Sequence, residues 1–90
     1  MKIRTLIVDD MLLARKRIRR YLSKDSEIEI VGECNNGQQA IEAFAELKPQ
    51  LVFLDVQMPE TDGFEFVEAL RGEELPTIIF VTAHDQFAIR

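Results

Sequence analysis

Three aspartates and a threonine stand where short apolar runs of the sequence end. Asp9 and Asp10 follow one run, Asp55 follows another, and Thr82 follows a third. If these runs are parallel strands, their carboxyl ends lie along one edge of a sheet, where ligands bind in such folds. Clustered carboxylates raise one another's pKa unless a cation neutralises them. An all-oxygen cluster of this kind suits Mg²⁺, so the sequence predicts a magnesium site with a reactive carboxylate and a neighbouring hydroxyl.

Segments with helical periodicity separate the apolar runs, which indicates alternating strands and helices. The runs are rich in branched or aromatic residues, as parallel strands buried between helices are. The pattern predicts an α/β fold with a doubly wound parallel sheet. The expected strands are residues 3–8, 27–33, 51–55 and 77–82. The first helix is expected over residues 11–22, the second between Asn36 as its cap and Pro49, and the third from Phe64 to Gly72.

Apolar positions indicate which faces of these elements are buried. The strand over residues 27–33 alternates apolar and acidic residues, so we expect it at a half-exposed edge of the sheet. The expected inward stripe of the first helix is Ala14, Ile18, Tyr21 and Leu22, and that of the second is Ala40, Ile41, Phe44 and Leu47. Core positions are also expected for Cys34, Phe53, Phe64, Phe66 and Phe80.

Length and composition restrict the class of protein. Ninety residues, 47% of them apolar, make one small domain. A net charge of −5 argues against nucleic acid binding by this segment. No run of 18 apolar residues is present, and the N-terminus leads directly into a strand without room for a signal peptide. The single cysteine excludes an internal disulfide, so we expect a cytoplasmic protein.

The fold predicted from these elements is incomplete after residue 82. Residues 78–81 are apolar on both faces, as an interior strand would be, but too few residues follow to pair with it or cover it. Right-handed crossovers place the first helix on one face of the sheet and the next two on the other. We therefore expect an open apolar edge, which could support a homodimer.

Four motifs resemble those of the receiver domain of bacterial two-component response regulators. They are Val8-Asp9-Asp10, Leu54-Asp55-Val56-Gln57-Met58-Pro59, Asp62-Gly63 and Val81-Thr82-Ala83. The resemblance covers the whole chain and implies a flavodoxin-like (CheY-like) fold with strand order 2-1-3-4. Strand 5 and helix 5 would be missing, so residues 1–90 would form a C-terminally incomplete receiver domain. Residues 81–89 also resemble the LytR/AlgR group, whose receivers usually precede a LytTR-type DNA-binding domain.

The resemblance implies a role for each residue of the predicted site. Asp55 would accept a phosphoryl group from the phosphohistidine of a sensor histidine kinase. Asp10 and Asp55 would ligate Mg²⁺ through their side chains, Gln57 through its backbone carbonyl, and Asp9 through a water. Thr82 would hydrogen-bond a phosphoryl oxygen. The protein would be a phosphoacceptor that regulates transcription through a separate output domain, and no enzyme beyond its own phosphorylation and dephosphorylation.

One departure from the family concerns a lysine. Receivers carry an essential lysine at the end of strand 5, whereas the lysines here are Lys2, Lys16, Lys24 and Lys48. We therefore predict that this chain binds Mg²⁺ but is phosphorylated weakly or not at all.

Three other interpretations remain open at this point. Phosphatases of the haloacid dehalogenase kind also place a nucleophilic aspartate after their first strand, but as Asp-x-Asp, whereas this chain has Asp9-Asp10-Met11. The chain could instead act only as a self-association or protein-binding module. The basic residues of the first helix, Arg15–Arg17, Arg19 and Arg20, form either a solvated face or a docking surface for the kinase.

Overall fold

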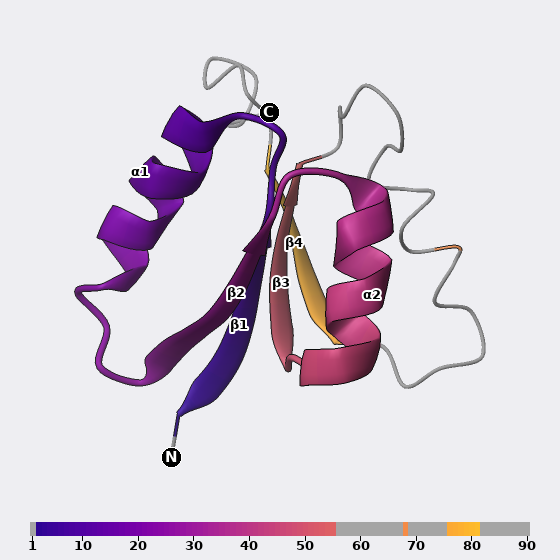
Figure 1. The fold of residues 1–90 in the computed structure, drawn as a ribbon. Helices are drawn as coiled ribbons and strands as arrows, with labels where there is room; N and C mark the ends of the chain where they lie inside the picture. Colours follow the sequence, from indigo (N-terminus) through magenta and orange to yellow (C-terminus); the bar gives the residue numbers. More distant parts are fainter. Residues whose placement is uncertain (1, 56–67, 69–75, 82–90) are drawn as a thin grey trace.

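Parallel strands form a single sheet with a helix on each face. The computed structural model describes residues 2–55, 68 and 76–81. The strands are β1 (Ile3–Val8), β2 (Ile28–Cys34), β3 (Leu51–Asp55) and β4 (Thr77–Val81), and the helices are α1 (Leu12–Leu22) and α2 (Gly37–Leu47). The strand order is β2-β1-β3-β4, with every neighbouring pair parallel. Figure 1 shows α1 and α2 on opposite faces of this sheet, which confirms the flavodoxin-like, doubly wound prediction.

The main core lies between the sheet and α2. It comprises Leu6, Val8, Cys34, Ala40, Phe44, Val52 and Leu54, with Ile41, Ala43, Leu47 and Ile78 packed against it. The predicted apolar stripe of α2 and the buried position of Cys34 are therefore confirmed. Gly32 keeps α2 close to β2, because a Cβ atom there would lie 3.1 Å from Leu47 Cδ1.

Helix α1 packs more loosely on the other face. None of its residues is fully buried, and Ala14, Ile18 and Leu22 are half-buried. The prediction that Tyr21 points inward is wrong, because its side chain is 67% exposed. The Lys24 ammonium lies 5.8 Å from the centroid of the Tyr21 ring, a cation–π contact that suits an exposed aromatic residue.

Strand β2 lies at the edge of the sheet, as predicted, but it does not alternate regularly. Ile30 pairs with Thr5 and Gly32 pairs with Leu6, so Val31 is an extra residue in a β-bulge. The bulge reverses the side-chain alternation after Val31. Glu33 therefore pairs with Ile7 and shares the face covered by α1.

Local hydrogen bonds define the two ends of α2. The Asn36 side chain accepts a hydrogen bond from Gln39 N at 2.8 Å, which confirms the predicted N-cap. At the other end, Lys48 adopts a left-handed conformation with φ of 49° and donates its N–H to Phe44 O. Arg4 of β1 donates from its guanidinium to Leu47 O, tying this end of the helix to the sheet.

Strand β4 is the outermost described strand next to β3. Ile79 is 42% exposed and Phe80 is 45% exposed, so the expectation that Phe80 lies in the core is wrong. In the described part of the chain β4 pairs with β3 on one side only, which leaves its side chains less covered than those of β1 and β3. The predicted third helix falls almost wholly outside the described residues. Among those residues, no helix combines the length and apolarity needed to cross a bilayer.

Candidate functional site

Three aspartates meet at the carboxyl edge of the two central strands. Asp9 follows β1 directly, and Asp55 is the last residue of the neighbouring strand β3. One carboxylate oxygen from each of Asp9, Asp10 and Asp55 lies within 4.8 Å of the others. Asp9 and Asp55 are each only 1% exposed, whereas Asp10 is accessible to solvent. We call these three residues the acidic site; the structure brings them together as the sequence predicted.

The turn that carries Asp9 and Asp10 is fixed by hydrogen bonds of Asp9 to the backbone of Cys34 and Met11. Asp9 N donates to Cys34 O at 3.0 Å, which extends the contact between β1 and β2 by one residue. The Asp9 carboxylate accepts a hydrogen bond from Met11 N at 2.9 Å. This side-chain turn fixes one Asp9 oxygen and directs the chain from the sheet into α1.

Burial makes the acidic site unfavourable to negative charge. It raises the pKa of the Asp9 carboxyl above its usual value, and the nearby Asp10 carboxylate raises it further. The hydrogen bond from Met11 N and the positive charge of Arg15 oppose this rise. The arrangement therefore favours either a proton or an added cation at neutral pH.

The residues present fit a small, hard divalent cation. The ligands are carboxylate oxygens, two of the three groups are buried, and their oxygens are close enough to share one ion. Mg²⁺ is commonly held by one or two carboxylates while it keeps several waters, and the exposure of Asp10 leaves a path for those waters.

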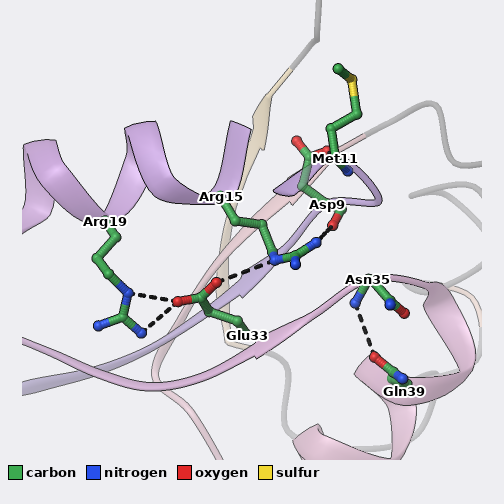
Figure 2. A network of polar contacts seen from close by, with 7 residues as sticks. All are labelled: Asp9, Met11, Arg15, Arg19, Glu33, Asn35 and Gln39. Atoms are coloured by element: carbon green, nitrogen blue, oxygen red, sulfur yellow. Dashed lines mark hydrogen bonds and ion pairs between the residues drawn. The ribbon is translucent and has the colours of Figure 1, made fainter. Parts of the chain in front are cut away.

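Arginines from α1 connect the acidic site to the edge strand. Arg15 Nη1 donates to the backbone carbonyl of Asp9 at 2.7 Å, and Arg15 Nε contacts Glu33 Oε1 at 3.2 Å. Arg19 Nε donates to Glu33 Oε2 at 2.6 Å. Figure 2 shows Glu33 between the two guanidinium groups, with Arg15 reaching back to Asp9. Two of the basic residues of α1 are thus engaged by Glu33, although the Arg19 side chain remains 51% exposed.

Comparison with known proteins identifies the family. Residues 5–90 match the family described as response regulator receiver domain. The chain belongs to this family. The receiver is 49% identical over 88 residues to the transcriptional regulatory protein BtsR of Escherichia coli strain K12, a match that covers 98% of this chain and 37% of BtsR.

Solved receiver structures share the fold. The signal receiver domain of the response regulator NarL from Mycobacterium tuberculosis is 37% identical, with a TM-score of 0.83 over 98% of this receiver and 72% of that chain. The response regulator domain of Thermotoga maritima CheB gives a TM-score of 0.86 at 28% identity, over 92% of this receiver and 62% of that chain. The receiver spans 36% and 37% of the first two curated relatives that it matches.

Two of the predicted site residues cannot be compared with the structure. Gln57 and Thr82 lie outside the described residues. Val81, the described residue that precedes Thr82 in the sequence, lines a cleft of about 160 Å³ together with Asp9 and residues of α1. This cleft opens beside the acidic site.

The link through Arg15 and Glu33 was not predicted from the sequence. The signal available was the spacing of Arg15 and Arg19, because residues four apart lie on the same side of a helix. The partner could not be identified in the same way, since regular alternation places Glu33 away from the Ile28 and Ile30 face. Only the bulge at Val31 brings Glu33 under α1.

Proposed function

We propose that this receiver is a phosphoacceptor whose Asp55 takes a phosphoryl group from a sensor histidine kinase. The proposal rests on one observation above all: Asp55 ends a central strand beside Asp9 and Asp10 in a chain of the receiver family. Receiver domains are signalling domains rather than metabolic enzymes, so the substrate of this chemistry is the protein's own carboxylate.

The proposed reaction is an in-line displacement at phosphorus. An Asp55 carboxylate oxygen forms a bond to phosphorus while the bond to the kinase imidazole nitrogen breaks, which gives an acyl phosphate and free histidine. Such transfers depend mainly on positioning and on neutralising charge at the transferred group. The Thr82 hydroxyl would donate a hydrogen bond to a phosphoryl oxygen.

Mg²⁺ is the cofactor that we propose for this step. Asp10 and Asp55 would bind it through their carboxylates, Gln57 through its backbone carbonyl, and Asp9 through a water. When bound, the ion would neutralise negative charge on the phosphoryl oxygens. The raised pKa of Asp9 supports the proposal, because a cation relieves the repulsion that burial imposes on these carboxylates.

The output of the proposed switch would be transcriptional. Its relative BtsR is named a transcriptional regulatory protein and is longer than the matched region. We propose that DNA binding belongs to a separate domain of the LytTR type, with residues 1–90 serving as receiver. For kinase docking we favour the basic residues of α1 that Glu33 does not engage: Lys16, Arg17 and Arg20.

Phosphate incorporation from acetyl phosphate tests the proposed function. We expect slow, Mg²⁺-dependent labelling of the 90-residue chain that is lost in Asp55→Asn, with the NarL receiver domain as a positive control. Labelling that persists in Asp55→Asn would place the phosphoacceptor elsewhere. Labelling without Mg²⁺ would contradict the proposed requirement for this ion. No labelling of a folded chain would contradict the proposal that this chain is a phosphoacceptor.

One further observation favours a second candidate function. Ile79 and Phe80 expose apolar surface on the outermost described strand beside β3. Such a strand can pair with another chain. The second candidate is therefore a self-association or protein-binding module that operates without phosphorylation.

A further inference from the structure

Arg15 makes contacts that extend beyond an ordinary surface ion pair. Its side chain is 14% exposed, although it stands on the loosely packed helix α1. The guanidinium contacts two different elements at once, the Asp9 carbonyl after β1 and the Glu33 carboxylate on β2. Because the guanidinium is planar and rigid, these two contacts define its position.

The bulge in β2 makes this arrangement possible. Without the bulge, Val31 would pair with Leu6, and the regular alternation of β2 would direct Glu33 toward the α2 face. With it, Glu33 lies on the α1 face, and Arg19 binds its other oxygen at 2.5 Å. Glu33 is therefore held from one side by Arg19 and presents its remaining oxygen to Arg15 (Figure 2).

The contact to Asp9 completes the fixation of the turn. Asp9 N is bound by Cys34 O, the Asp9 carboxylate by Met11 N, and the Asp9 carbonyl by Arg15. The next residue is Asp10, whose carboxylate meets those of Asp9 and Asp55. The backbone position that Arg15 holds is thus one bond from the residue that places the second carboxylate of the acidic site.

We propose that Arg15 is a positioning residue for divalent cation binding: by joining Glu33 to the Asp9 carbonyl, it sets the geometry of the Asp9–Asp10 pair. The inference rests on the proposed role of the acidic site as a Mg²⁺ site. A positioning role and a simple charge effect predict opposite changes in cation affinity when Arg15 is replaced. Removing a positive charge near the site would by itself strengthen cation binding, whereas removing a positioning contact weakens it.

Urea unfolding at a series of MgCl₂ concentrations tests the inference with the 90-residue chain. The stability without Mg²⁺ and the Mg²⁺ dissociation constant both follow from these curves, because a ligand of the native state stabilises it in proportion to occupancy. We expect Arg15→Met to raise the dissociation constant about tenfold, the lower end of the usual effect of contacts that orient metal ligands. Arg15→Lys keeps the charge but has one ammonium in place of the planar fork, so we expect weakened binding there too.

Arg20→Met is the matched control. It removes the same charge from the same helix, and its side chain takes no part in the contacts around Glu33, so we expect the dissociation constant to change less than twofold.

Equal or tighter Mg²⁺ binding by Arg15→Met would overturn the positioning role, as would full affinity in Arg15→Lys. A loss of stability in Arg15→Met at unchanged affinity would show a structural role only. If the unmodified chain binds no Mg²⁺, the proposed cofactor fails and this inference fails with it; if it binds Mg²⁺ and the Arg15 variants match it, only this inference fails.

Discussion

At the scale of single residues, the acidic site holds a carboxyl group where burial disfavours its charged form. Asp9 is buried beside two other carboxylates, and its pKa is raised mainly by burial. The folded state therefore holds the protonated form of Asp9 more readily than the unfolded state does. The stability that Asp9 contributes is complete below its unfolded pKa near 3.8, and it is lost as the pH rises through the folded pKa.

Replacing the Asp9 carboxylate by an amide should therefore stabilise the protein at neutral pH. Asp9→Asn keeps an oxygen for the hydrogen bond from Met11 N and removes the buried charge. We expect a gain of about 0.5–2 kcal/mol in the free energy of unfolding at pH 7 without divalent cations, a common range for relieving such sites. Urea denaturation in EDTA between pH 3 and pH 8 measures it.

The pH dependence distinguishes this cause from a general effect of lost charge. The gain should vanish below the unfolded pKa, where Asp9 is protonated and resembles the amide in charge. Asp25→Asn is the control, because Asp25 is an exposed turn residue whose side chain accepts a comparable hydrogen bond from Glu27 N. A less stable Asp9→Asn protein at pH 7 would contradict the assigned cost of the buried charge.

At the scale of elements, helix α2 ends in a conformation that suits glycine better than the residue present. Lys48 has φ of 49°, in the left-handed region, and its N–H caps the helix by binding Phe44 O. A side chain in this conformation costs about 1–2 kcal/mol, whereas glycine adopts it freely.

We expect Lys48→Gly to stabilise the protein by about 0.5–1 kcal/mol. The relief of strain is partly offset because glycine gives the unfolded chain more freedom. Thermal or urea unfolding measures the change. Lys48→Ala serves as the control: it removes the same long exposed side chain but keeps Cβ, so it should show no such gain. Equal stability of the two variants would indicate that the backbone conformation is not strained.

The elements also show which features a sequence can predict. The stripe of α2 and the Asn36 cap followed from periodicity and capping chemistry, which depend on neighbours in the sequence, whereas the strand order followed from the resemblance to receiver domains. The bulge at Val31 depends on how β2 pairs with β1, since one extra residue is accommodated only by the partner strand. The exposure of Tyr21 likewise depends on tertiary packing, because periodicity gives the direction of a side chain but not what covers it.

The acidic site was predictable for the same reason that the fold was. Asp9 and Asp55 are placed by the ends of two adjacent parallel strands, so their meeting follows from topology alone. The contacts of Arg15 required a side chain from a helix, a bulge on an edge strand and a backbone carbonyl to coincide. Such three-element contacts have no regular spacing in the sequence, and they appear only in the assembled fold.

At the scale of the whole molecule, apolar surface is distributed unevenly. The buried core lies between the sheet and α2, whereas β4 exposes Ile79 and Phe80. An exposed apolar strand at the edge of a sheet can pair with a strand of a second chain. A pair formed by two copies of β4 would be symmetric, since the same surface contributes on both sides.

We expect the 90-residue chain to form a concentration-dependent dimer through this strand, with Ile79→Lys weakening dimerisation at least tenfold. A lysine on an exposed strand opposes pairing because its charge would be buried in the interface. Sedimentation velocity over a range of concentrations measures the equilibrium. Tyr21→Lys is the control, because it adds the same charge at a side chain that is 67% exposed on α1 rather than on β4. A monomer at every concentration, or equal weakening in both variants, would contradict association through β4 and favour the phosphoacceptor function over the second candidate.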